Sequence, residues 1–185
     1  MSDRYHECLG VLMAYEGGLT DDPGDPGGLT NHGVTHAEYD AYRDLMGQPR
    51  QSVADITKDE VEWIFDKFYW QLAHADDLPA GLDLLVFDCA VNSGVCHSIR
   101  CFQMCLGVPH DGHFGPITLA AARGAEWPAL INAMCDERAR YLRSLRGFNR
   151  GGSNGKGFGK GWLARVEDVR ARALATAGGE HAESV

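Results

Sequence analysis

Residues 16–35 of this 185-residue chain read EGGLTDDPGDPGGLTNHGVT. The stretch is rich in Gly, Pro, Asp and Asn and poor in apolar side chains, a composition that favours turns. In the preceding segment, 3–15, apolar side chains recur on one helix face, at Tyr5, Leu9, Leu12 and Met13. We therefore predict a helix over 3–15 that ends in a left-handed cap at Gly17-Gly18, followed by an ordered loop or short hairpin over 19–35.

Capping signals and apolar periodicity predict helices along most of the remaining chain. Thr57-Lys58-Asp59-Glu60 forms a capping box ahead of apolar positions that extend to Leu72. Further helices are expected at 79–92, at 95–106 up to Gly107, after Pro116, after Pro128 and at 162–174. The sequence therefore predicts a mainly α fold with at most a small β-hairpin near residues 19–35.

Composition excludes two classes of protein. Hydrophobic residues make up 44% and charged residues 23% of the chain, so it can bury a core and is not disordered throughout. It has no uninterrupted apolar run long enough to span a bilayer, so we expect no stable membrane insertion. The first residues lack the basic and apolar segments of a secretory signal, so we expect synthesis in the cytoplasm and export by another route.

Charge is unevenly distributed along the chain. The formal net charge is −9, with 7 basic against 22 acidic residues over 1–137 and 10 basic against 4 acidic residues over 138–185. The overall negative charge argues against a general nucleic-acid binder. The basic C-terminal part suits contact with an anionic envelope, an attraction that salt would weaken. A merely solvated helix face explains the same pattern.

The six cysteines are too few to serve as a disulfide scaffold for a chain of this length. Cys96, Cys101 and Cys105 lie close together beside His97, but the CxxC pairs of zinc sites are absent. We interpret the cysteines as structural, buried thiols. No metal ion and no organic cofactor are expected.

Glu16 is the candidate catalytic residue. It continues the apolar stripe of the first predicted helix and lies at that helix's C-terminal end, and both conditions favour a protonated carboxyl group. A carboxylic acid held protonated can act as the general acid of glycosidic cleavage, which needs a second carboxylate nearby. Asp21, Asp22 and Asp25 follow in the loop, and Asp25 is the preferred partner. A calcium loop is the alternative, but the spacing does not match it.

Other residues are candidates for substrate binding. Asp88 and Asn92 lie four residues apart on one helix face, where they could line a sugar groove or hold a loop. Tyr15 and Trp70 could stack on sugar rings, although aromatic residues at helical spacing also form cores. His36 could hydrogen-bond a carboxylate or lie on the surface.

The motif from Glu16 to Thr35 closely resembles the signature of glycoside hydrolase family 108, N-acetylmuramidases that occur as phage endolysins and secretion-associated lysozymes. Asp88-Cys89-Ala90-Val91-Asn92-Ser93-Gly94 looks like a further motif of that family. Residues 106–118 and 161–166 resemble the predicted peptidoglycan-binding region that accompanies it. The resemblance covers roughly residues 5–170.

This resemblance implies a lysozyme-like helical fold in two parts. The catalytic part covers 1–92, and the peptidoglycan-binding-like part covers 93–175. The two parts are expected to pack into one globule, followed by a flexible tail over 176–185. It implies cleavage between N-acetylmuramic acid and N-acetylglucosamine, with Glu16 as general acid. By similarity to phage lysozymes, the second group falls on Asp25, and a water-positioning residue falls on Asn31 or the adjacent Thr30.

The expected partner is the glycan strand of peptidoglycan in the periplasm or cell wall, bound by a monomer. A holin or a secretion system would carry the chain across the membrane. A lytic transglycosylase that uses Glu16 alone and a non-catalytic wall-binding module are the alternatives.

Overall fold

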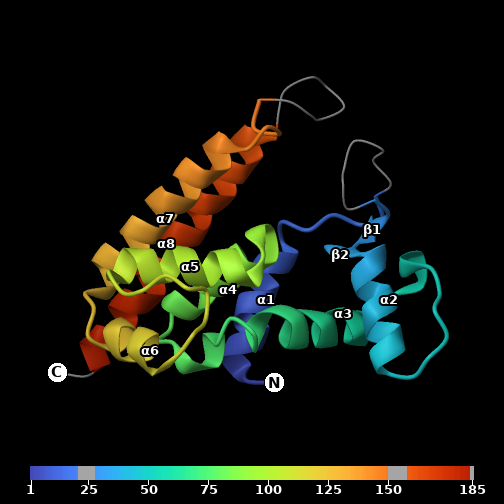
Figure 1. The fold of residues 1–185 in the computed structure, drawn as a ribbon, viewed down its shortest axis with the longest axis horizontal. Helices are drawn as coiled ribbons and strands as arrows, with labels where there is room; N and C mark the ends of the chain where they lie inside the picture. The colour runs from blue at the N-terminus through green and yellow to red at the C-terminus, as the bar shows by residue number, and fades with distance from the viewer. Residues whose placement is uncertain (21–27, 150–157, 184–185) are drawn as a thin grey trace. The chain divides into compact units, whose positions relative to one another are not determined.

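The computed structural model describes residues 1–20, 28–149 and 158–183, with the backbone alone over 179–183. The chain forms two compact units, Met1–Phe68 and Tyr69–Val185 (Figure 1). The boundary lies earlier than the predicted one at 92/93. The reason is helix α4 (Leu82–Ser93), which packs on helices α5 and α8 that follow it in the chain. The predicted packing of both parts into one globule stays a prediction.

The first unit begins with helix α1, Asp3–Met13, whose N-terminus is capped by the Ser2 side chain. The predicted end of α1, a left-handed cap at Gly17-Gly18, is wrong. The helix stops at Met13 with Ala14 as a right-handed cap, and neither Gly17 nor Gly18 has a positive φ. Glu16 therefore lies in the chain beyond the helix rather than on its last turn.

A hairpin and two capped helices complete this unit. Strands β1 (Thr30–Asn31) and β2 (Val34–Thr35) pair antiparallel, and the chain continues through α2 (His36–Leu45), the 3-10 turn η1 (Val53–Asp55) and α3 (Lys58–Phe65). The predicted capping box at Thr57 and Glu60 is confirmed. Thr35 and Glu38 form a second one at α2, which the Thr-x-x-Glu spacing could have revealed.

Helix α3 is shorter than the predicted helix that extends to Leu72. It ends at Phe65, and the chain continues as a π-helical turn, η2 (Asp66–Trp70). Leu72, placed on the buried face by its spacing, is 56% exposed. The wider π turn rotates the following residues off the α-helical stripe.

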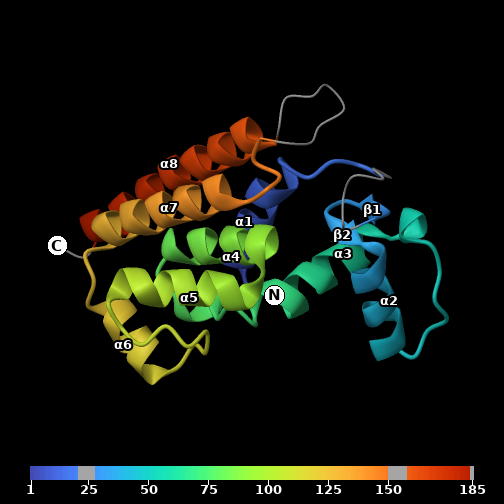
Figure 2. The same cartoon turned by 45° about the horizontal axis from the view of Figure 1, so that its top comes forward.

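The second unit is built from helices. After the 3-10 turn η3 (Ala75–Asp77) it contains α4, α5 (Val95–Leu106), α6 (Pro116–Arg123), α7 (Trp127–Ser144) and α8 (Gly159–Glu183). The predicted stop at Gly107 and the prolines in the first turns of α6 and α7 are confirmed. Helices α7 and α8 lie side by side in both views (Figures 1 and 2).

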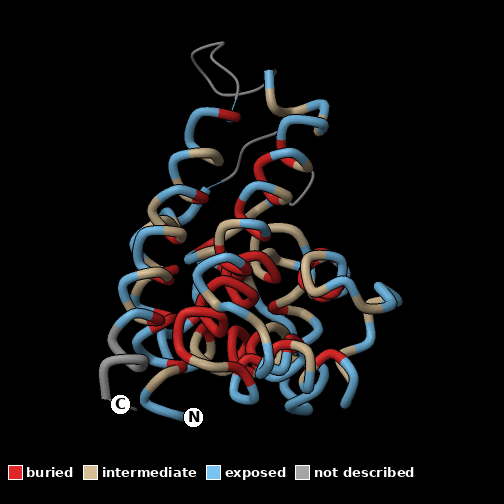
Figure 3. The backbone as a smooth tube through the Cα atoms, turned by 90° about the vertical axis from the view of Figure 1, so that its left-hand side faces the viewer, coloured by how far each residue is buried: buried red, intermediate tan, exposed pale blue. Residues whose placement is uncertain are grey.

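Helix α4 forms the centre of the core of this unit. Nine consecutive residues, Leu82 to Ala90, are buried; buried residues are drawn in red in Figure 3. Gly81, its N-cap, has φ +96° and lies so close to α8 that a Cβ there would be 2.5 Å from the Ala173 carbonyl oxygen. A glycine is therefore needed where these two helices meet.

A single buried glutamine joins α5 to α6. The Gln103 side-chain amide donates to Asp111 Oδ1 at 3.0 Å, to the His113 carbonyl at 2.9 Å and to Thr118 Oγ1 at 3.1 Å. Its oxygen accepts from the Gly112 backbone N–H at 2.9 Å. These bonds hold the connecting turn and the start of α6 against α5.

The mainly α fold with one small hairpin near residues 19–35 is confirmed, and it matches a lysozyme-like architecture. The predicted last helix, 162–174, is longer than expected because α8 runs from Gly159 to Glu183. The predicted tail over 176–185 is thus helical as far as Glu183. No helix in the described part of the chain is long and apolar enough to cross a membrane.

Candidate active site

The hairpin turn holds the side chain of Glu16. His32 and Gly33 form its two central residues, with φ +50° and +78°, a combination typical of the tight turns of two-residue hairpins. A Cβ on Gly33 would lie 2.8 Å from Glu16 Oε2 and 2.9 Å from its Cδ. The carboxyl group of Glu16 therefore packs directly on the bare Cα of Gly33.

The segment after Glu16 is fixed to the same hairpin. The Thr20 N–H donates to the Thr30 carbonyl at 2.8 Å, and the Thr30 N–H donates back to the Thr20 carbonyl at 2.9 Å. This pair extends the hairpin by a third short stretch of chain. Glu16 is thus held between helix α1 and a small sheet, and its side chain is half-buried.

Asp25, the preferred second carboxylate, lies outside the described residues, as do Asp21 and Asp22. In the sequence, Asp25 lies between Thr20 and Thr30. Thr20 and Thr30 are paired through their backbones beside the hairpin that holds Glu16.

Asn31 and His36 attach the hairpin to η1. Asn31 is 7% exposed, and its Nδ2 donates to the carbonyls of Val53 at 3.2 Å and Ala54 at 3.4 Å. The Val53 N–H donates to His36 Nδ1 at 3.4 Å. These contacts support the turn beneath Glu16, a positioning role that the sequence pattern did not reveal.

Thr30 and Tyr15 are the remaining predicted residues of the first unit. Thr30 Oγ1 donates to the Gly28 carbonyl at 3.1 Å, which stabilises the returning end of the loop. Tyr15, directly before Glu16, is half-buried, and its backbone N–H donates to the Leu12 carbonyl at 2.9 Å. The structure therefore places four predicted residues in the hairpin or in the segments that contact it: Glu16, Thr30, Asn31 and His36.

The other three predicted residues lie in the second unit, and two of them have structural roles. Trp70 is 1% exposed and packs edge to face on Phe87, with ring centroids 5.1 Å apart. Its prediction as a sugar-stacking residue is wrong, because the ring belongs to the core. Asn92 is partly exposed near the end of α4, where its Oδ1 accepts from Ser93 Oγ at 3.2 Å.

Asp88 is fully buried and forms two ion pairs. Its Oδ2 lies 2.6 Å from Arg138 Nη2, and its Oδ1 lies 2.8 Å from Arg165 Nε. Of the two interpretations of Asp88, the structural one holds, because both carboxylate oxygens are used to join α4, α7 and α8. The sequence pattern did not reveal Arg138, although it lies on the apolar stripe of α7, four residues after Met134.

All six cysteines are free thiols. Cys8, Cys89, Cys101 and Cys135 are buried as predicted, whereas Cys96 is exposed and Cys105 is partly exposed. Across the described ranges, no group of three or more His, Cys, Asp or Glu side chains is placed to hold a metal ion.

Comparison with known proteins agrees with this architecture. Residues 9–94 match the family model "Glycosyl hydrolase 108", and residues 97–167 match the "Predicted Peptidoglycan domain". The chain is similar to the solved structure of Brucella abortus SagA, with 37% sequence identity and a TM-score of 0.81 over 93% of this chain and 94% of that one. No curated protein matches.

The two family models meet between residues 94 and 97, close to the predicted boundary at 92/93, whereas the compact units divide before α4. The shared fold extends over nearly the whole chain, including both family regions. The chain therefore belongs to glycoside hydrolase family 108, as a hydrolase of peptidoglycan in the cell wall that carries a predicted peptidoglycan domain.

Proposed function

We propose that the protein is an N-acetylmuramidase, which hydrolyses the bond between N-acetylmuramic acid and N-acetylglucosamine with Glu16 as general acid. The observation that carries the proposal is the position of Glu16. Glu16 is half-buried and its carboxyl group packs on Gly33 at the hairpin turn, so the carboxyl group is pre-positioned rather than free to adopt many rotamers.

In this mechanism, Glu16 donates its proton to the glycosidic oxygen as the bond to the sugar breaks. A second carboxylate then acts in one of two ways. It stabilises or attacks the positively charged sugar itself, or it activates a water molecule that attacks this sugar. Asp25 is the proposed second group. Asp25 lies between Thr20 and Thr30 in the sequence, and the backbone pairing of these two residues beside the hairpin that holds Glu16 supports the proposal.

We assign supporting roles to the other predicted residues. Asn31 and His36 position the hairpin through η1, and Thr30 stabilises the returning end of the loop. Tyr15 is the proposed aromatic contact for a sugar ring, since it adjoins Glu16 and is partly exposed. Asn92, partly exposed on α4, is a proposed polar contact for the glycan.

The test is mass spectrometry of soluble products from purified Gram-negative peptidoglycan. Wild type is expected to release reducing muropeptides that end in N-acetylmuramic acid, and Glu16→Gln is expected to release none. Glu7→Gln is the control, because Glu7 is an exposed residue of α1 that forms an ion pair with nearby Arg4. Anhydro-muropeptides would instead identify a lytic transglycosylase, in which the muramoyl hydroxyl attacks and no second carboxylate is required.

A further inference from the structure

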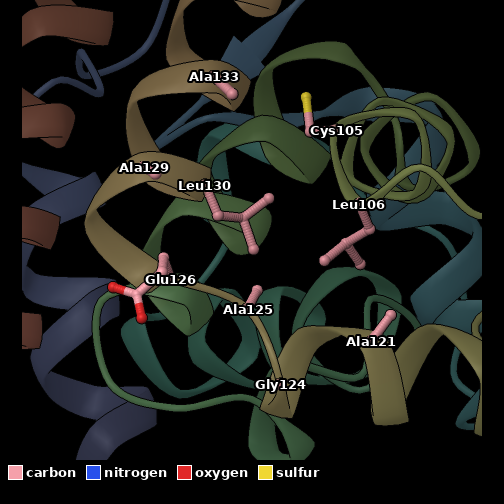
Figure 4. Close-up of a pocket in the computed structure, with 9 residues that line it drawn as sticks. All are labelled: Cys105, Leu106, Ala121, Gly124, Ala125, Glu126, Ala129, Leu130 and Ala133. Carbon is pink, nitrogen blue, oxygen red and sulfur yellow. The ribbon is translucent and has the colours of Figure 1, made fainter.

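A pocket lies in the second unit, between the end of α5, the end of α6 and the first turns of α7 (Figure 4). Its volume is about 430 Å³, which is in the range of small-molecule sites. The nine residues that line it are Cys105, Leu106, Ala121, Gly124, Ala125, Glu126, Ala129, Leu130 and Ala133. All of them fall within the region that matches the predicted peptidoglycan domain.

Most of the side chains that line the pocket are apolar, and many of them are short. Four of the lining residues are alanines, and Leu106 and Leu130 point toward one another across the space (Figure 4). Such a wall fits methyl groups and short aliphatic chains. A sugar ring is instead recognised by an aromatic face and several polar groups, and no aromatic side chain is among the nine.

Glu126 is the one charged side chain in the lining, and it stands at the rim. It is exposed, and its side chain makes no capping hydrogen bond to α7, although it is the N-cap residue. Within the described ranges it has no ion-pair partner. Its carboxylate is therefore available to a cationic group of a ligand whose apolar part occupies the pocket.

Peptidoglycan contains one component with this combination of groups. Its short peptides combine the methyl groups of alanine with the free amine of a diamino acid, whereas its glycan strand carries hydroxyl, acetamido and lactyl groups and no amine. We propose that this pocket binds the peptide stem of peptidoglycan, with alanine methyl groups on the alanine wall and the diamino acid's ammonium group at Glu126. The proposal rests on peptidoglycan being the substrate.

Cys105 provides a direct readout of occupancy. The hydrogen bond from the Cys101 thiol, helped by the charge of Arg140, lowers the pKa of the Cys105 thiol although burial opposes this shift, which favours the thiolate that iodoacetamide alkylates. Cys96 is exposed on the first turn of α5 and does not line the pocket. It serves as an internal reference in the same molecule.

The experiment follows alkylation of both thiols by iodoacetamide with mass spectrometry of peptides. The tetrapeptide L-Ala-γ-D-Glu-meso-diaminopimelate-D-Ala is expected to slow Cys105 alkylation at least threefold at saturation and to leave Cys96 unchanged. Chitotetraose, a glycan without peptide, is expected to protect neither thiol. Protection by chitotetraose alone, or by neither ligand, would overturn the proposal.

Substitutions in the pocket test where the tetrapeptide binds. Ala129→Leu fills the pocket from an exposed position on α7 and is expected to abolish protection, whereas Ala175→Leu, at an exposed position on α8, keeps it. Glu126→Gln is expected to weaken the tetrapeptide about two- to fivefold, as for an exposed ion pair, and Glu126→Asp restores most of the affinity. Unchanged affinity in Ala129→Leu would overturn the assignment.

Measurements of glycan hydrolysis distinguish this proposal from the proposal that Glu16 is the general acid. Ala175→Leu, the control variant outside the pocket, should hydrolyse peptide-free glycan at the wild-type rate. If wild type hydrolyses no glycan but the tetrapeptide still protects Cys105, the catalytic proposal fails and the peptide site stands. If hydrolysis proceeds without any protection of Cys105, the peptide site fails alone.

Discussion

Replacing Gly33 by alanine tests how the hairpin positions Glu16, the proposed general acid. The new Cβ would lie 2.8 Å from Glu16 Oε2, whereas ordinary contacts begin at 3.4 Å, so the carboxyl group must move by about 0.6 Å. Misplacement of a reacting group by about 1 Å can reduce the rate about 100-fold. We therefore expect Gly33→Ala to reduce kcat roughly 10- to 100-fold.

The same substitution also strains the backbone, and this effect must be separated from the first. Alanine at φ +78° costs roughly 1–2 kcal/mol, which lowers the Tm of a chain of this size by roughly 2–8 °C. Gly47 provides the matched control, because it has φ +65° and, among the described residues, only its chain neighbours come within 4 Å of the position that a Cβ would take. Gly47→Ala should lose similar stability and retain activity.

The assay is release of soluble muropeptides from purified peptidoglycan at a temperature where both variants are folded, with Tm measured by circular dichroism. Equal, small losses of activity in the two variants would refute the reasoning, since strain alone would then explain the effect. A large loss confined to Gly33→Ala would support it.

The remaining predictions concern stability and wall binding. Asp88→Asn removes the negative charge that two guanidinium groups share and should lower the unfolding free energy by about 3–5 kcal/mol in urea titrations; a change below about 1 kcal/mol would contradict the role of the ion pairs. Gly81→Ala combines a positive φ with a 2.5 Å approach to the Ala173 carbonyl oxygen, so it should cost roughly 2–5 kcal/mol in the same assay. Burial, and then the charges of Arg138 and Arg100, lower the pKa of His97 from 6.5. Because the unfolded chain then binds a proton that the folded chain does not, stability should fall as the pH drops below 6.5, and His97→Gln should reduce this slope. Finally, if the basic C-terminal part holds the protein on the wall, co-sedimentation with peptidoglycan should decrease as salt rises; binding that is insensitive to salt would contradict this.

Several structural elements could be read from the sequence because their determinants are local. The Thr57 capping box, the stop at Gly107 and the prolines of α6 and α7 each act within about one helical turn. The hairpin near residues 19–35 is similarly local, since its turn requires residues that tolerate positive φ. The end of α1 was not predictable from Gly17-Gly18, because Ala14 closes the helix first.

The sequence by itself determined the mainly α fold, the hairpin and the family motif that contains Glu16. Only the tertiary structure decided that Gly33 supports Glu16, that Trp70 belongs to the core and that Asp88 joins three helices. Asp88 meets partners 50 and 77 residues away in the chain. Residue type and periodicity place a side chain on a helix face, but whether that face meets solvent, substrate or a buried guanidinium depends on which distant segment packs against it.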